Sequence, residues 1–149
     1  MARAVTSPSS NIAISSAGRR VFGTWQADHQ HVTPTSEISI MTSKTDQIRA
    51  LNDELRQHLH GGLAVITPGI AALGQEAVER IVKTIAVYDD FCHANDPHEE
   101  HDFGAFDADG HRIFFKIDYF DKDLTYHSPD PADPSVTERV ITIMLADEY

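Results

Sequence analysis

One dipeptide, Asp109-Gly110, constrains the fold of this chain more than any other feature of its sequence. Asp-Gly is among the pairs that best close a two-residue hairpin turn, because such a turn needs a positive φ at both positions. The residues on either side, 102–106 and 112–121, contain the aromatic and β-branched side chains that are typical of strands. The sequence therefore predicts a β-hairpin over residues 102–121.

The predicted turn also fixes which residues face each other across the hairpin. With Asp109-Gly110 at its centre, His101 faces Asp118 and Phe103 faces Lys116. Because side chains alternate along strands, one face carries the apolar residues and is the predicted core side. Its members are Phe106, Ile113, Phe115, Ile117 and Tyr119. A four-residue turn would change the pairing and leave the same residues on each face.

The rest of the chain predicts further helices and strands. Apolar residues recur at helical spacing over 45–60 and again over 75–89, with a helical turn starting at Pro68 between them. Short apolar runs at 63–66 and 138–145 predict buried strands, although a helix is an alternative for 138–145. The sum is an α+β fold, with two helices packed on a mixed or antiparallel sheet of about four strands.

The first forty residues differ in composition from the rest of the chain. Eleven of them are Ser or Thr, and no amphipathic period persists over more than a few positions. Such a segment buries too little apolar surface to offset the entropy of ordering. We therefore expect a disordered or poorly ordered extension over residues 1–40 and a single α+β domain over residues 41–149.

The charge of the chain bears on its partners. The formal net charge is −11, and residues 41–149 carry 21 acidic residues against nine basic ones. This excess repels phosphates and disfavours direct nucleic-acid binding, whereas it suits a basic protein surface. The oligomeric state stays open.

Cysteine content and hydropathy bear on location. Cys92 is the only cysteine, so neither an intramolecular disulfide nor a cysteine-rich zinc site can form. No apolar run reaches the ~18 residues of a membrane span. We therefore expect a cytoplasmic protein that does not enter a membrane.

One polar group of residues is a candidate active site. On the predicted polar face of the hairpin, Asp118 would orient His101 as a general base, and Lys116 would stabilise developing negative charge. His98, His101 and Asp102 are the candidate ligands of a divalent metal, the cofactor that this cluster suits. A purely structural His–Asp contact between strands remains the alternative.

Three segments in order resemble a known family. They are residues 95–104, 116–121 and 137–149, with the sequences NDPHEEHDFG, KIDYFD and TERVITIMLADEY. Over about residues 48–149 the chain resembles a bacterial domain-of-unknown-function family, the one numbered 3768. In that family's pattern a Gly often stands at the position of Glu99 and a Tyr at that of Phe120. The resemblance implies no established activity, and it implies an accessory role that is compatible with mobile elements.

Two functions follow from these observations as expectations. The first is an uncharacterised small acidic bacterial accessory protein that binds a basic protein through its acidic surface, above all through residues 89–133. The second is a metal-assisted hydrolase that uses the His/Asp cluster between residues 96 and 118. A third, a module whose motifs specify only its fold, stays open beside them.

Overall fold

The computed structural model describes residues 42–149 and, before them, the backbone of three strands, β1 (Val5–Ser7), β2 (Ser10–Ile14) and β3 (Arg20–Phe22). The extension predicted over residues 1–40 therefore lies largely outside the described residues, and its disorder stays a prediction. None of the helices among the described residues is long and apolar enough to cross a membrane.

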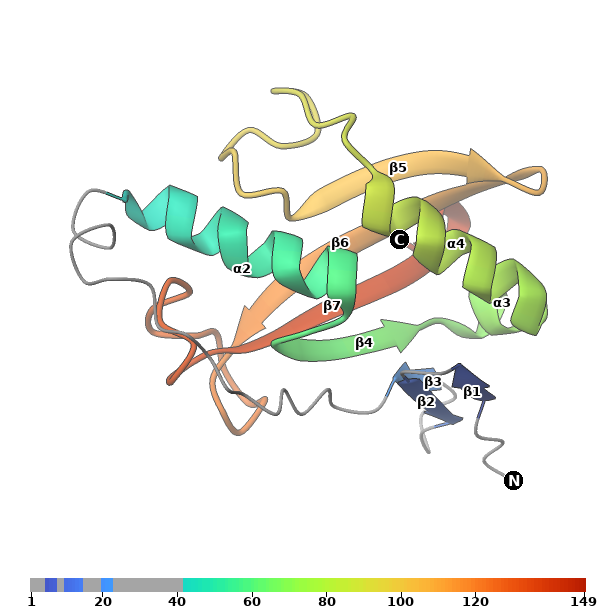
Figure 1. The fold of residues 1–149 in the computed structure, drawn as a ribbon, viewed down its shortest axis with the longest axis horizontal. Helices are drawn as coiled ribbons and strands as arrows, with labels where there is room; N and C mark the ends of the chain where they lie inside the picture. Colours follow the sequence, from blue (N-terminus) through green and yellow to red (C-terminus); the bar gives the residue numbers. More distant parts are fainter. Residues whose placement is uncertain (1–4, 8–9, 15–19, 23–41) are drawn as a thin grey trace.

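Two helices pack on one face of the sheet, α2 (Lys44–His58) and α4 (Gln75–Val87), with the short α3 (Pro68–Ala71) just before α4 (Figure 1). The side chain of Ser43 accepts a hydrogen bond from the Asp46 amide over 3.1 Å and so caps the start of α2. Both predicted helices are confirmed.

The sheet has the strand order β1-β2-β3-β4-β7-β6-β5. The bounds of its last four strands are Gly62–Ile66 for β4, Phe103–Ala108 for β5, His111–Phe120 for β6 and Glu138–Leu145 for β7. Since β4 and β7 are parallel and the other pairs are antiparallel, the sheet is mixed. The predicted α+β class is confirmed, with β7 as a central strand and β1–β3 added beyond the β4 edge.

The hairpin forms in the predicted register. Phe103 pairs with Lys116, and the turn residues Asp109 and Gly110 have φ values of 53° and 81°. Both are positive, as a type I′ turn requires. The predicted core residues of β6 are buried: they are Ile113, Phe115, Ile117 and Tyr119.

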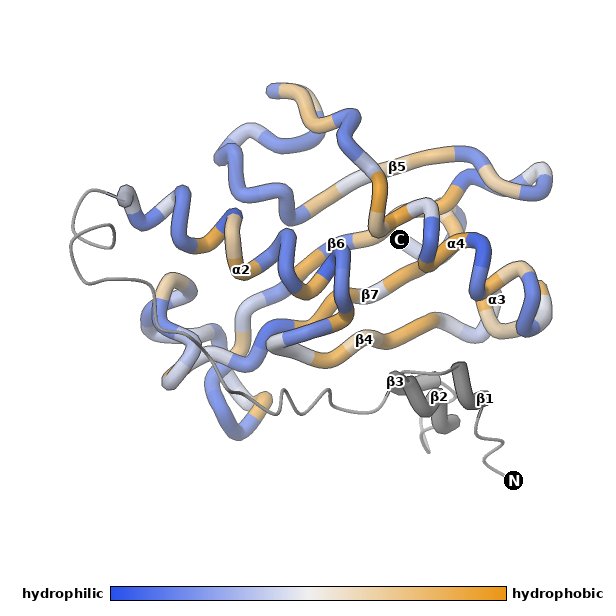
Figure 2. The backbone as a smooth tube through the Cα atoms, viewed as in Figure 1, coloured by the Kyte–Doolittle hydropathy of each residue, from blue (hydrophilic) through white to orange (hydrophobic). Residues whose placement is uncertain are grey.

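The core lies between α2, α4 and this face of the sheet, to which β4, β6 and β7 contribute hydrophobic residues (Figure 2). Two arginines are also buried there, Arg56 on α2 and Arg139 on β7. The opposite face of the sheet is approached by the C-terminal 3₁₀ helix η1 (Ala146–Glu148). After it, the Tyr149 ring packs against Phe103 and Phe114.

Candidate functional site

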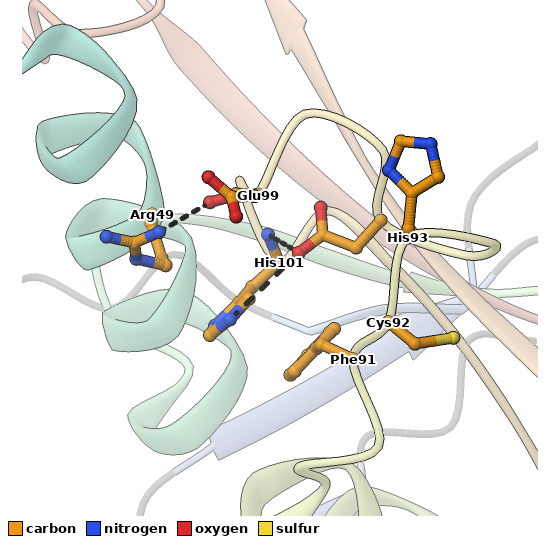
Figure 3. A pocket seen from close by; sticks show the side chains of 7 residues that line it. Arg49, Phe91, Cys92, His93, Glu99 and His101 are labelled. Atoms are coloured by element: carbon orange, nitrogen blue, oxygen red, sulfur yellow. Dashed lines mark hydrogen bonds and ion pairs between the residues drawn. The ribbon is translucent and has the colours of Figure 1, made fainter.

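A pocket of about 200 Å³ lies between α2 and the loop that joins α4 to β5 (Figure 3). We call it the loop pocket. Its lining residues are Arg49, Phe91, Cys92, His93, Asp96, Glu99 and His101. They include three polar residues of the family-like segment 95–104, namely Asp96, Glu99 and His101.

One face of α2 holds the loop in place through four polar side chains. Arg49, Asn52, Asp53 and Arg56 recur at the three- and four-residue spacing that aligns side chains along a helix. Arg49 donates to the Glu99 carbonyl over 2.9 Å, and Asn52 donates to the Glu100 carbonyl over 2.9 Å. These contacts make α2 the support of the loop as well as one side of the core.

Arg56 anchors the end of α4 to the same helix. Its buried guanidinium donates to the carbonyls of Ile85 and Tyr88, each over 2.8 Å, and pairs with Asp53 over 2.9 Å. Its Nε is buried without a hydrogen-bond partner among the described residues, and the guanidinium lies 5.1 Å from the Phe91 ring centre. Arg56 is therefore held by carbonyls, one carboxylate and an aromatic face.

Asp96 organises the loop itself. Its buried carboxylate accepts hydrogen bonds from the amides of Glu100 over 2.9 Å and His101 over 3.1 Å. Two residues of this loop have positive φ values, Glu99 with 59° and His101 with 57°. A Gly at position 99, as in the resembled family's pattern, would adopt this conformation without strain.

His101 lies on the helix side of the sheet, and the prediction that it faces Asp118 is wrong. Its left-handed backbone breaks the strand alternation before β5 begins at Phe103. The ring instead stacks on Phe91 with centres 3.9 Å apart, and Nδ1 lies 2.9 Å from Asp53 Oδ1. Nε2 is 4.0 Å from Asp96 Oδ2, so both ring nitrogens are directed at carboxylates of the fold.

Lys116 and Asp118 lie on the opposite face of the sheet, as predicted. Their side chains form an ion pair of 3.2 Å. They line a second hollow of about 410 Å³, which we call the sheet groove. The sheet thus separates the three candidate catalytic residues, His101 on one side and Lys116 with Asp118 on the other.

The candidate metal ligands are not gathered. Within the part of the chain that the structure describes, no group of three or more His, Cys, Asp or Glu side chains could hold a metal ion. His98 is exposed and Asp102 is half-buried. Burial, together with the neighbouring carboxylates of Glu100 and Asp96, raises the pKa of Asp102.

Cys92 and His93 both line the loop pocket. The Cys92 thiol is free and exposed, and Figure 3 shows it directed away from His101. Sequence reasoning missed Asp53 as the partner of His101 and Asp96 as the residue that caps the loop. The helical spacing of Asn52, Asp53 and Arg56 was the available signal for the first.

The comparisons agree with the motifs. Neither the curated proteins nor the solved structures contain a match to the chain. Residues 66–148 match the family described as "Protein of unknown function (DUF3768)", a shorter range than the predicted 48–149 that still contains all three motifs up to Glu148. The match covers more than half of the chain, which therefore belongs to this family, DUF3768.

Proposed function

We propose that this protein is a binding module for a basic polypeptide. The observation that carries the proposal is the uneven burial of charge. Among residues 42–149, 20 of the 21 acidic residues are at least partly exposed, against seven of the nine basic ones. Because Arg56 and Arg139 are buried, the exposed residues of this range have a larger excess of acidic over basic groups than the range as a whole.

The acidic residues of 89–133 lie on several elements, and some of them pair with nearby groups of the fold. Asp109 in the hairpin turn pairs with Arg80 on α4 over 2.8 Å, and Asp107 pairs with Arg112 over 3.3 Å. Asp121 accepts the amides of Thr125 and Tyr126 in its own loop. Exposed pairs of this kind contribute little and exchange readily with other charges, so they remain open to a basic partner.

The alternative, a metal-assisted hydrolase, has less support from the geometry. It needs His101, Lys116 and Asp118 to act on one substrate, and these residues lie on two sides of the sheet. Both nitrogens of the His101 ring are directed at carboxylates of the fold, those of Asp53 and Asp96. This geometry suits a residue that joins the loop to α2.

The experiment is a titration of the full chain with two fluorescent peptides of equal length, one of lysine and leucine and one of glutamate and leucine. We expect the lysine peptide to bind with an affinity that falls as salt rises, because charge attraction is screened over about 8–10 Å at ordinary ionic strength. The glutamate peptide and duplex DNA should not bind. Equal binding of the two peptides, or binding of neither, would refute the proposal.

A further inference from the structure

The sheet groove is the larger of the two hollows described above and lies on the face opposite α2 and α4. Its lining residues are Thr67, Lys116, Asp118, Phe120, Val140, Thr142, Met144, Glu148 and Tyr149. They come from β6, β7 and the two segments that follow β4 and β7. The groove is therefore built on two central strands of the sheet and on the segments that leave β4 and β7.

The groove combines an apolar floor with an aromatic wall. Val140 and Phe120 contribute half-buried apolar surface from neighbouring strands, and the side chain of Met144 beside them is buried. The Tyr149 side chain is 77% exposed, and its ring packs edge-on against Phe103 and Phe114, with ring centres 6.2 and 5.8 Å away. Tyrosine is among the residue types that most often anchor an interface.

Carboxylates line the same groove. Asp118 is 41% exposed and is paired only with Lys116 among the described ion pairs. Glu148 is fixed by Thr67 Oγ1 over 2.6 Å and by the amides of Gly69 and Leu145 over 3.1 and 3.0 Å. Burial alone would raise the pKa of Glu148, but these three hydrogen bonds outweigh burial and lower the pKa, which keeps the carboxylate ionised.

The loop pocket is a poorer docking site. The Asp96 carboxylate already accepts two backbone amides, Arg49 is bonded to Glu99 and Asp46, and His101 is held by Asp53. The loop pocket also has about half the volume of the sheet groove. Its polar groups are thus engaged with one another.

We infer that the sheet groove is the docking site of the basic polypeptide, an inference that rests on the proposed function. An apolar side chain of the partner packs on Val140, Phe120 and Tyr149. A neighbouring lysine or arginine of the partner pairs with Asp118, in competition with Lys116. A second copy of this chain is disfavoured as the occupant, since each copy carries a net charge of −11 and the two would repel each other.

The test is an NMR titration of the ¹⁵N-labelled full chain with the lysine and leucine peptide. We expect the amide shifts to concentrate at Thr142, Met144 and Tyr149. Tyr149→Ser should weaken binding by about tenfold and Asp118→Asn by about threefold, as for an anchor and a rim charge. Asp90→Asn, an equal change of charge on an exposed loop outside the groove, is the matched control and should leave the affinity unchanged.

The results distinguish failure of the docking site from failure of the proposed function. Shifts confined to residues 89–102, with groove variants that bind like the original chain, would overturn the docking site and leave the proposed function standing. Absence of any binding would overturn both. A dimer in sedimentation that Tyr149→Ser abolishes would show that a second copy fills the groove. Tyr149→Phe keeps the ring and should keep the affinity, which separates loss of the anchor from loss of folding.

Discussion

Arg139 donates a hydrogen bond from Nε to Oδ1 of Asn52 over 3.0 Å, and both side chains are buried. The bond joins β7 at the centre of the sheet to α2. Asn52 also donates to the Tyr119 hydroxyl over 2.7 Å, and the Tyr119 ring lies 5.3 Å from the Arg139 guanidinium. Burial lowers the pKa of Arg139 and raises that of Tyr119, as expected for polar groups in the core.

Replacing Asn52 with Leu should destabilise the fold by about 2–4 kcal/mol, because it leaves Nε of the buried Arg139 guanidinium without its acceptor. Chemical denaturation measures this change. The double variant Asn52→Leu/Arg139→Met should lose less free energy of unfolding than the two single variants together, since it also removes the charge that Asn52→Leu leaves unpaired. Additive losses would show that the two residues stabilise the fold independently.

Asp96→Ala should destabilise the loop between α4 and β5. Two backbone amides lose their acceptor, which costs about 1–3 kcal/mol when they stay buried. Hydrogen exchange should accelerate at the amides of Glu100 and His101 more than elsewhere. Asp90→Ala in the same connection is the control and should leave both amides as they are; unchanged exchange in Asp96→Ala would remove its capping role.

Glu99→Gly should leave the loop intact and stabilise the protein by up to about 1 kcal/mol. The residue has a φ of 59°, which costs a non-glycine residue roughly 1–2 kcal/mol, whereas glycine loses more entropy on folding. Arg49 bonds to the carbonyl of residue 99, so that contact persists. Thermal melting checks this prediction: Glu99→Gly should melt at a higher temperature than Glu99→Ala, which keeps the strain. Equal melting temperatures would contradict it.

Asp102→Asn should raise stability at neutral pH. The folded-state pKa of Asp102 lies above its ordinary value, so the folded chain holds the proton more tightly than the unfolded chain does. Its contribution to stability therefore falls as the pH rises through the interval between the unfolded and folded pKa values. The variant should gain over the original chain above this interval and lose the advantage below it, which denaturation at several pH values would reveal.

Prolonged dialysis against a chelator should leave the melting temperature unchanged. Among residues 42–149 no group of three or more His, Cys, Asp or Glu side chains could hold a metal ion, and packing and hydrogen bonds hold the described fold. Native mass spectrometry of untagged protein, beside His101→Ala, checks the same point. A stoichiometric metal that the variant loses would instead favour the hydrolase alternative.

The fold was largely predictable because its elements are encoded locally. Turn chemistry at Asp109-Gly110 fixed the hairpin register, and apolar periodicity located α2 and α4. The central position of β7 followed from its run of apolar and β-branched residues, which suits a strand with a neighbour at each edge.

The site was harder to predict because it depends on backbone conformation and burial. The alternation that placed His101 opposite Asp118 assumes extended residues up to the hairpin, and the left-handed φ at position 101 ends it. Arginine is rarely fully buried, so composition gave no reason to place Arg56 and Arg139 inside. Their partners are mainly carbonyl and amide oxygens, which leave no charge pattern in the sequence.

The place of β7 between β4 and β6 has a consequence for how the chain folds. β7 follows both neighbours in the sequence, so a nascent chain that has emerged as far as β6 has two unpaired strand edges and an open core. Its parallel pairing with β4 also closes a long loop, and such non-local contacts slow folding. Cooperative folding therefore awaits the last strand, and until then the exposed edges are the segments most at risk of aggregation.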